Sequence, residues 1–436
     1  MKLRYLLYAL CMLSLSAQEA YCSMIDINGN NYPVDTLEQY MVGPGMEYTR
    51  FNVRIGSTLH KLYLLTADLS NPYVKIEENP GQDRLGKTEG MVSVHKRIDS
   101  IGHHSVGSVN CNFWVVSSQN VGHNEGLLNQ PFAGTAKDGV LITEPDDWNY
   151  AYDDNGIVHG DRGFVMIDDM GRALIRNLVW NGRIISGTKS YAIRDCNRTR
   201  VNPNASEITL FNRYIGEPTR LIPDTAVEVI FSPIDGKPWS INDTMQCVVT
   251  SVNNTGGTTL SGTMGALQGR GKGKTRINKC ITAVGDTFSL YLGMYSHSLM
   301  SDDAPGNDSI TPRIMQMVTG NCLVMENGEL NIRNTNETYN NQNYPRTMIA
   351  TNNEGSKLWL LVSERPGNYT AEMCGILKND GATWAAGMDG GGSAQMNLLG
   401  NIVNTTTEGT PRAVSNSLFV INTAPESSIA TKLSSK

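Results

Sequence analysis

The chain has 436 residues, of which 40% are hydrophobic and 18% charged, and its formal net charge is -6. These values fit a globular protein with a large core and exclude a chain that is disordered throughout. The acidic balance argues against a general nucleic-acid binder, which needs a basic face to displace phosphate counterions. Any anionic substrate must therefore be bound by a local group of cations.

The first 22 residues have the layout of a secretory signal peptide. Lys2 and Arg4 precede an apolar run at residues 6–15, and small and polar residues follow. The run is shorter than the roughly 20 apolar residues of a membrane-spanning helix. We expect a secreted or periplasmic protein with no transmembrane segment. Lipid attachment at Cys22 is the less favoured alternative, because residues 19–21 do not match the apolar and small residues expected before a lipidated cysteine.

The chain in order predicts an α+β fold in which strands dominate. We expect a β-rich mixed sheet core with a few flanking helices and a β-rich middle layer. The expected divisions are a signal peptide at 1–22, an N-terminal extension at 23–48, one domain at 49–422 whose β-rich middle covers about 130–300, and a polar tail at 423–436.

The first strands and the first helix have clear signals. Short apolar and β-branched runs predict strands at 51–55 and 61–69. Apolar residues then recur at helical spacing from Met91 to Ile101, and Gly102 ends the pattern, which predicts an amphipathic helix over 89–101.

In the middle of the chain, short strands alternate with Asp-Gly and Asn-Gly turns. The run Gly269-Arg270-Gly271-Lys272-Gly273-Lys274 lacks the spacing of a nucleotide-binding P-loop. We expect it to be an exposed hairpin connection.

Cysteine residues are scattered, with no Cys-x-x-Cys pair that would indicate zinc. An exported protein can oxidise some of them, so we expect buried cysteines with one or two disulfides. The cysteines after the signal peptide are Cys111, Cys196, Cys247, Cys280, Cys322 and Cys374.

Residues 340–380 predict a hairpin followed by a helix. Strands at 348–351 and 358–362 form the hairpin, with Arg346 at its mouth. Thr370 is a candidate cap for the following helix. Glu372 falls in the first turn, where the free N–H groups favour a carboxylate, so helix stabilisation alone would explain it.

A strand at 385–388 leads into Asp389-Gly390-Gly391-Gly392-Ser393. Three glycines after a carboxylate let the backbone turn sharply, and their N–H groups can form a concave anion-binding nest. A flexible turn is the simpler interpretation, but three glycines are entropically costly for an ordinary hairpin.

These motifs resemble the phosphodiester glycosidase family, of the type that uncovers N-acetylglucosamine from mannose 6-phosphate. The resemblance covers roughly residues 50–422, and its specific part is the Asp389–Ser393 block. The other matching segments are Asn110–Trp114, Gly320–Val324 with Gly328, Pro345–Thr347, Thr370–Met373 and Arg412–Val414.

The resemblance implies an exported hydrolase that cleaves sugar-1-phosphodiester linkages on glycans or surface polysaccharide. Such cleavage needs a carboxylate near the anomeric carbon, and cations or N–H donors at the phosphate. We expect Asp389, Glu372 and Arg346 to be catalytic, with Asp389 on the sugar side and Arg346 on the phosphate side. The expected substrate-binding residues are Asn110, Gly320, Asn321, Thr347, Arg365, Gly390, Gly391, Gly392, Ser393 and Arg412.

Three departures from the family pattern, among them Cys111 and Asn112 where small residues are usual, keep a second hypothesis open. Ser363-Glu364-Arg365 stands where the family commonly has Asp-Gly-Arg, and Asn321 replaces a glycine. The alternative is a noncatalytic carbohydrate-binding protein of the cell envelope on the same fold.

The expected partner is a phosphorylated glycan or polysaccharide, with no nucleic acid. No cofactor and no metal-binding motif such as His-Glu-x-x-His is predicted. The acidic pairs Asp153-Asp154 and Asp302-Asp303 are the candidates for a divalent cation.

Overall fold

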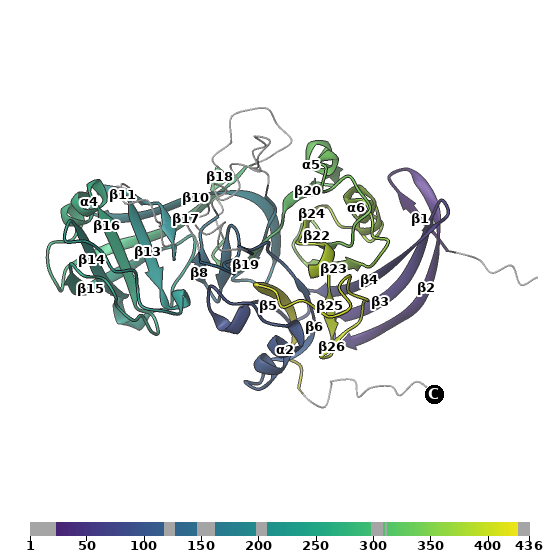
Figure 1. Ribbon diagram of the computed structural model, residues 1–436, viewed down its shortest axis with the longest axis horizontal. Coiled ribbons are helices and arrows are strands. Elements are labelled where there is room, and N and C mark those ends of the chain that lie inside the picture. Colours follow the sequence, from purple (N-terminus) through teal and green to yellow (C-terminus); the bar gives the residue numbers. More distant parts are fainter. Residues whose placement is uncertain are drawn as a thin grey trace, which may run out of the picture.

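The computed structural model describes residues 23–116, 127–145, 162–197, 207–297, 308–309 and 312–425. The predicted signal peptide, most of the polar tail and both acidic pairs lie outside these residues. Three sheets make up the described chain (Figure 1).

One sheet carries most of the predicted site residues. It has nine described strands in the order β1-β2-β3-β4-β23-β22-β24-β20-β21. All of its pairings are antiparallel. The strands are β1 (Ser23–Ile27), β2 (Asn30–Gly43), β3 (Met46–Ile55), β4 (Thr58–Asp68), β20 (Cys322–Glu326), β21 (Glu329–Leu330), β22 (Thr347–Thr351), β23 (Lys357–Ser363) and β24 (Trp384–Gly387).

A smaller antiparallel sheet packs on one face of the nine-stranded sheet. Its described order is β26-β25-β6-β27-β5. The strands are β5 (Val74–Pro80), β6 (His104–Asn110), β25 (Met396–Leu398), β26 (Asn401–Ile402) and β27 (Asn416–Asn422).

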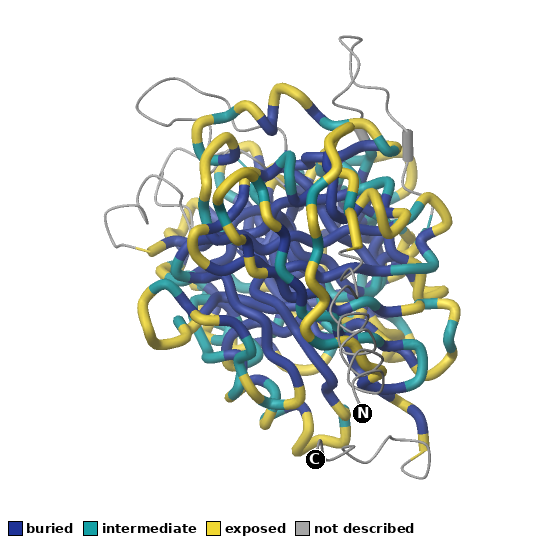
Figure 2. Tube along the Cα trace, turned by 90° about the vertical axis from the view of Figure 1, so that its right-hand side faces the viewer, coloured by how far each residue is buried: buried dark blue, intermediate teal, exposed yellow. Residues whose placement is uncertain are grey.

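Both faces of the nine-stranded sheet are buried at its middle strands β22, β23 and β24. Successive side chains of a strand point to opposite faces, so Leu360 of β23 packs against Val109 and Val420 of the smaller sheet. Its neighbour Leu361 packs on the other face against Met373 of α6 (Thr370–Asn379). This explains why β23 reads as a continuous apolar run, and Figure 2 shows buried strands with exposed connections around them.

The middle of the chain forms a third sheet, of 13 described strands, in the order β12-β13-β16-β14-β15-β17-β10-β9-β19-β7-β8, with β11 and β18 pairing at its side. It encloses a separate apolar core. The strands are β7 (Thr135–Lys137), β8 (Val140–Thr143), β9 (Phe164–Asp168), β10 (Ala173–Ser186), β11 (Lys189–Ile193), β12 (Asp195–Cys196), β13 (Ile208–Asn212), β14 (Ala226–Pro233), β15 (Thr244–Asn253), β16 (Gly265–Arg270), β17 (Thr287–His297), β18 (Asp308–Ser309) and β19 (Ile314–Thr319).

The described helices are few and short, so the predicted α+β class is only roughly consistent with a structure that strands dominate. The α-helices are α2 (Met91–Asp99), α4 (Lys272–Cys280), α5 (Ile332–Asn336) and α6. The 3-10 helices are η1 (Gly81–Asp83), η3 (Arg213–Ile215), η4 (Ile234–Gly236) and η5 (Gly391–Ser393).

Two local predictions need correction. The helix predicted over 89–101 is present as α2, but it ends earlier, and Ile101 lies beyond it with 67% of its surface exposed. The hairpin expected at Gly269–Lys274 is wrong, because Gly271, with a φ of +48°, turns the chain from β16 directly into α4.

All of the cysteines at described positions are buried, and none of them forms a disulfide. The one or two disulfides expected from the sequence are therefore absent among Cys111, Cys196, Cys247, Cys280, Cys322 and Cys374. Within the same described residues, no helix is long and apolar enough to cross a membrane.

Candidate active site

Three neighbouring strands of the nine-stranded sheet begin or end at the same edge of the sheet, across the strand direction. The predicted residues lie at this edge. β22 begins at Thr347, β23 ends at Ser363 and β24 ends at Gly387. Because β22 runs antiparallel to both neighbours, these three points lie side by side. The Met388 N–H then donates to the Thr347 carbonyl (2.8 Å), which extends the pairing by one residue and delivers Asp389 to this edge.

The backbone of Asp389 is fixed to the end of β6. Its N–H donates to the Cys111 carbonyl (2.9 Å), and its carbonyl accepts from Asn110 Nδ2 (2.7 Å). The Thr347 hydroxyl completes the link by donating to Asn110 Oδ1 (2.7 Å). Asn110 and Thr347 are both fully buried, so their polar groups hold Asp389 in place.

The carboxyl group of Asp389 lies in a desolvated position. Its residue is 9% exposed, and burial raises the pKa of the carboxyl to about 7. A hydrogen bond from Ser393, the charge of Arg412 and the N–H of Gly390 act in the opposite direction. Asp389 can therefore change its protonation state near neutral pH.

Arg412 is the cation beside this carboxyl. Its Nη1 donates to Ser393 Oγ (3.2 Å), so the Ser393 hydroxyl connects Arg412 to Asp389. Glu408 forms an ion pair with Arg412 and raises the pKa of the guanidinium. The Arg412 side chain is 38% exposed, which leaves part of it open to a ligand.

The glycine run is required by close packing. The N–H of Gly391 donates to the Pro345 carbonyl (2.8 Å), and Gly391 has a φ of +60°. A Cβ atom at Gly391 would collide with the Tyr344 hydroxyl, and one at Gly390 would lie 2.6 Å from the Pro345 carbonyl oxygen. A Cβ at Gly392 would collide with the Arg412 guanidinium.

Arg346 is buried and largely occupied by backbone carbonyl groups. Its Nε donates to Asn368 O (2.7 Å), and its Nη2 donates to Tyr339 O (2.6 Å), Gln342 O (2.9 Å) and Asn340 O (3.2 Å). Burial lowers the pKa of the guanidinium. These contacts make Arg346 a clamp for the segment that precedes β22.

Glu372 stabilises the beginning of α6. Its carboxylate accepts from Asn368 Nδ2 (3.0 Å) and from the Tyr369 N–H (3.2 Å). Thr370, expected as the cap, is instead the first residue of the helix and donates its hydroxyl to Asn340 Oδ1 (3.2 Å). No hydrogen bond in the described chain joins Glu372 to Asp389.

Gly320 and Asn321 support the end of β24. The N–H of Asn321 donates to the Gly387 carbonyl (2.5 Å), and the N–H of Gly320 donates to Gly163 O (2.7 Å). Gly320 also lies so close to Gly387 that a Cβ atom would be 2.5 Å from its carbonyl oxygen. Arg365 is exposed and makes no described hydrogen bond to Asp389.

Glu364, the departure from the family pattern, has a structural role. Its buried carboxylate accepts from Lys61 Nζ (2.8 Å), Tyr63 Oη (2.9 Å) and the Thr405 N–H (2.7 Å). Burial alone would raise the pKa of Glu364, but these hydrogen bonds, that of Lys61 first, outweigh it and lower the pKa.

The bond to Thr405 fixes one end of the segment 405–412, which we call the site strap. Within the strap, the Thr407 hydroxyl donates to Gly391 O (2.7 Å). Its other end carries Glu408 and Arg412 to the glycine turn. Glu364 is thus connected through the site strap to the residues around Asp389.

The sequence interpretation missed Tyr339. Its ring lies 5.1 Å from the Arg346 guanidinium, and the charge of Asp389 helps to raise the pKa of its hydroxyl, after the larger effect of burial. Tyr339 therefore lies between two predicted catalytic residues. The sequence signal was slight: two tyrosines, Tyr339 and Tyr344, shortly before Pro345-Arg346-Thr347.

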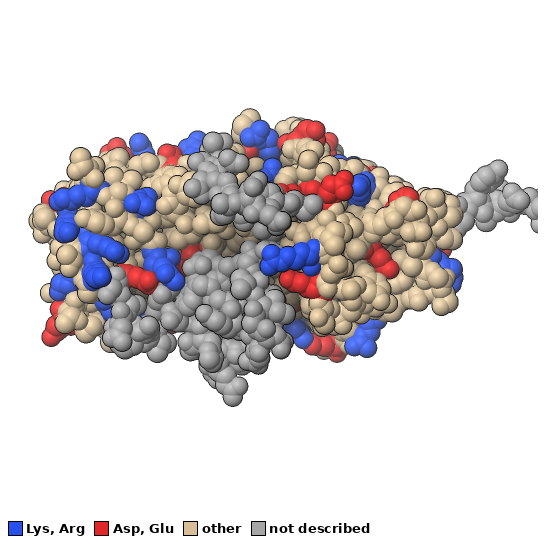
Figure 3. Space-filling view, turned by 90° about the horizontal axis from the view of Figure 1, so that it is seen from above, with Lys and Arg blue, Asp and Glu red and all other residues tan. Residues whose placement is uncertain are grey.

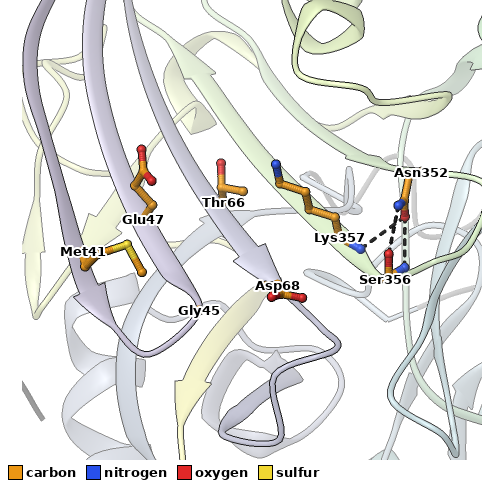
Figure 4. Close-up of a pocket in the computed structure, with 8 residues that line it drawn as sticks. All are labelled: Met41, Gly45, Glu47, Thr66, Asp68, Asn352, Ser356 and Lys357. Carbon is orange, nitrogen blue, oxygen red and sulfur yellow. Dashed lines mark hydrogen bonds between the residues drawn. The ribbon is translucent and has the colours of Figure 1, made fainter. Parts of the chain in front are cut away.

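An open pocket of about 440 Å³ lies at the opposite end of β22 and β23 (Figure 4). It contains none of the predicted site residues. Its lining residues are Met41, Gly45, Glu47, Thr66, Asp68, Asn352, Ser356 and Lys357. Within the described residues, no group of three or more His, Cys, Asp or Glu side chains could hold a metal ion.

Comparison with known proteins supports the resemblance. Residues 276–421 match the model of the phosphodiester glycosidase family, which confirms the predicted resemblance over that part of the chain. The matched segment includes Asp389, the glycine turn and Arg412. No protein of curated function matches the sequence.

Two solved structures share the fold. A hypothetical protein from Synechocystis has a TM-score of 0.58 at 16% identity, with 90% of this chain and 64% of that one covered, so this chain spans about two thirds of that protein's length. A protein from Burkholderia pseudomallei, whose name proposes that it is exported, has a TM-score of 0.60 at 13% identity, with 93% and 100% covered.

The catalytic domain of zebrafish N-acetylglucosamine-1-phosphodiester alpha-N-acetylglucosaminidase, auto-inhibited by its pro-peptide, is also found, with a TM-score of 0.41 at 13% identity. The comparison covers 89% of this chain and 87% of the zebrafish domain.

Proposed function

We propose that the protein hydrolyses sugar-1-phosphodiester linkages, with N-acetylglucosamine 1-phosphodiesters as the first substrates to test. The observation that carries the proposal is the desolvated carboxyl of Asp389 beside Ser393 and the partly exposed Arg412, at a turn of three glycines. The family match over residues 276–421 supports the same reaction class.

In the proposed reaction, a water molecule attacks the anomeric carbon and Asp389 accepts a proton from it. The bond between the anomeric carbon and the phosphate oxygen breaks, and its electron pair leaves with the phosphate. The products are the free sugar and a phosphomonoester. Because phosphate is a weakly basic leaving group, the reaction does not require a strong general acid.

Arg412 is proposed to meet the phosphate. In Figure 3, basic side chains gather toward the left end of the face shown, and basic and acidic side chains are mixed toward its right end. We therefore propose a local cation, not a broad basic surface, for the phosphate. A guanidinium next to the reacting carboxyl suits phosphate oxygens. The N–H of Gly392 is a further donor proposed to face the substrate.

The other predicted residues are proposed to position this group. Arg346 holds the segment before β22, and Asn110 and Thr347 hold Asp389. Glu372 stabilises α6. The proposal therefore moves the phosphate contact from Arg346 to Arg412 and leaves Asp389 as the reacting carboxylate.

We further propose that the protein acts outside the cytoplasm, on a phosphorylated glycan or surface polysaccharide. The apolar run at residues 6–15 supports export.

A noncatalytic carbohydrate-binding protein remains the second candidate. The observation in its favour is that Glu372, Glu364 and Arg346 are all engaged in internal hydrogen bonds.

Release of sugar from a panel of sugar-1-phosphodiesters, with and without a chelator, separates the two candidates. We expect turnover by the wild-type protein and loss of at least about a hundredfold in the Asp389→Asn variant. Sugar binding without turnover would support the second candidate, and equal turnover by Asp389→Asn would refute the role of Asp389.

A further inference from the structure

Three aromatic rings from two segments of the chain form one continuous array beside the glycine turn. The rings of Phe113 and Tyr339 are 5.8 Å apart at 73°, and those of Tyr339 and Tyr344 are 5.5 Å apart at 69°. Both are edge-to-face arrangements, which stabilise aromatic pairs. Phe113 follows β6, whereas both tyrosines lie between α5 and β22, so the array joins two distant parts of the chain.

The guanidinium of Arg346 contacts two rings of this array. Its guanidinium lies 5.1 Å from the centre of the Tyr339 ring and 6.0 Å from that of Tyr344. Its Nη2 also donates to the Tyr339 carbonyl. The ring of Tyr339 is therefore fixed both by its backbone and by its face.

The array directs two hydroxyl groups at the glycine turn. A Cβ atom at Gly390 would be 2.7 Å from the Tyr339 hydroxyl, and one at Gly391 would collide with the Tyr344 hydroxyl. The glycines thus allow the phenol groups to approach the backbone directly after Asp389.

The Tyr339 hydroxyl is buried, and no acceptor for its proton is found within the described structure, although the Gly390 N–H lies near enough to lower its pKa. A buried tyrosine hydroxyl normally finds a partner, because leaving it unpaired is unfavourable. Burial and the charge of Asp389 both raise the pKa of Tyr339, so the group stays protonated and can donate. An acceptor supplied by a ligand would satisfy it.

The three rings are only partly covered. Apolar faces next to a few directed polar groups are typical of small-molecule sites. A pyranose ring is complementary to such a site, because its faces carry C–H groups and its edge carries hydroxyl groups.

Building on the proposed function, we propose that Phe113, Tyr339 and Tyr344 form the subsite for the sugar ring, and that the Tyr339 hydroxyl donates a hydrogen bond to a sugar oxygen next to Asp389. The chemical class of ligand is a hexopyranose, and N-acetylglucosamine is the probe.

Binding of free N-acetylglucosamine, measured by calorimetry or by ligand NMR, tests this subsite without turnover. We expect the wild-type protein to bind the sugar and Tyr339→Phe to bind it about tenfold more weakly, because only a hydroxyl is removed while the ring stays in the array. Tyr48→Phe is the control, since it removes a buried hydroxyl in β3 and should leave binding unchanged.

The two proposals can fail separately. Equal affinity of Tyr339→Phe and wild type, or no sugar binding by the wild type, would overturn the subsite even if Asp389-dependent turnover is present. Weaker binding by Tyr339→Phe with no turnover of any sugar-1-phosphodiester would support the subsite and count against the hydrolase.

Discussion

The surroundings of Asp389 shift the pKa of its carboxyl in opposite directions. Desolvation favours its neutral form, while Ser393, Arg412 and the Gly390 N–H favour the carboxylate. The balance places its pKa at about 7, where a group can exchange a proton with water at low cost. This makes Asp389 the residue on which the proposed chemistry depends.

The proposed base role predicts a rising pH profile. Because Asp389 must be ionised to accept a proton, kcat/KM for a sugar-1-phosphodiester should increase with pH, with an apparent pKa of about 7. The Ser393→Ala variant should move this midpoint upward, since the hydroxyl lowers the pKa. Ser356→Ala, at the opposite end of β23, is the control. A profile that is flat from about pH 5 to 8 would contradict the role.

Burial of Asp389 also predicts how stability depends on pH. The pKa is raised from 3.8 to about 7 on folding. The stability that the protonated group contributes is therefore fully present below about pH 4 and is lost as the pH rises through 7, by about 4 kcal/mol in total. Asp389→Asn, which stays neutral, should thus unfold at higher denaturant concentration than wild type at pH 8, and this advantage should vanish near pH 4.

Denaturant unfolding at both pH values measures this difference. Asp224→Asn, at an exposed position, serves as the control. If Asp389→Asn is no more stable than wild type at pH 8, the carboxyl is not desolvated in the way described.

At the scale of elements, the end of β24 and the site strap meet around the glycine turn. The pairing of β24 with β22 positions Asp389, and the strap positions Arg412 beside Ser393. The strap contains no helix or strand, so its position depends on side-chain hydrogen bonds. Glu364 supplies the bond at its beginning.

Glu364→Gln should loosen the strap. The amide loses the ion pair with Lys61. Its NH₂ group, which can only donate, must also replace either the oxygen that accepts from Lys61 or the oxygen that accepts from both Tyr63 and Thr405. We expect faster hydrogen exchange over residues 405–412 and a tenfold or smaller fall in kcat/KM. Glu354→Gln, in the exposed turn between β22 and β23, should change neither. Unchanged exchange in the strap would show that Glu364 does not hold it.

At the scale of the whole molecule, buried asparagines join the five-stranded sheet to the 13-stranded sheet. Asn112, which follows β6, accepts at Oδ1 from the Thr319 N–H of β19 and from Asn416 Nδ2 of β27, both at 2.9 Å. Its Nδ2 donates to the Phe132 carbonyl (2.7 Å). One side chain thus forms hydrogen bonds with groups of both sheets. It is next in sequence to Cys111, whose carbonyl accepts from the Asp389 N–H.

Asn112→Ala should destabilise the whole protein. Removal of the amide takes the acceptor from the buried Thr319 N–H and one acceptor from Asn416 Nδ2, at a cost on the order of 3 kcal/mol. Urea unfolding followed by fluorescence measures the loss, with Asn341→Ala, at an exposed position, as the control. A change below about 0.5 kcal/mol would show that the junction does not depend on this contact.

The sequence alone predicted the parts that depend on local pattern. The helical spacing from Met91 to Ile98 identified α2, and the glycine run after Asp389 marked a close backbone approach. For Glu372, first-turn chemistry indicates helix stabilisation as one interpretation, with which the hydrogen bond from the Tyr369 N–H agrees, while the expected catalytic role stays a prediction. The helices and their first turns depend mainly on neighbours in sequence.

Long-range packing explains what the sequence could not provide. The guanidinium of Arg346 is occupied by carbonyl groups of residues 339–342, and no spacing rule predicts the path of that segment. Tyr339 lies next to the glycine turn only because the loop before β22 folds against it. Gly271 was read as part of a hairpin because a single glycine does not distinguish a strand-to-strand turn from a strand-to-helix turn.

The most direct test of the central claim is hydrolysis of an N-acetylglucosamine 1-phosphodiester in water labelled with oxygen-18. If water attacks the anomeric carbon with Asp389 as base, the label will appear in the released sugar, the phosphomonoester will be unlabelled, and Asp389→Asn will form neither product at a significant rate. Label in the phosphomonoester, or undiminished labelling of the sugar by Asp389→Asn, would contradict the account.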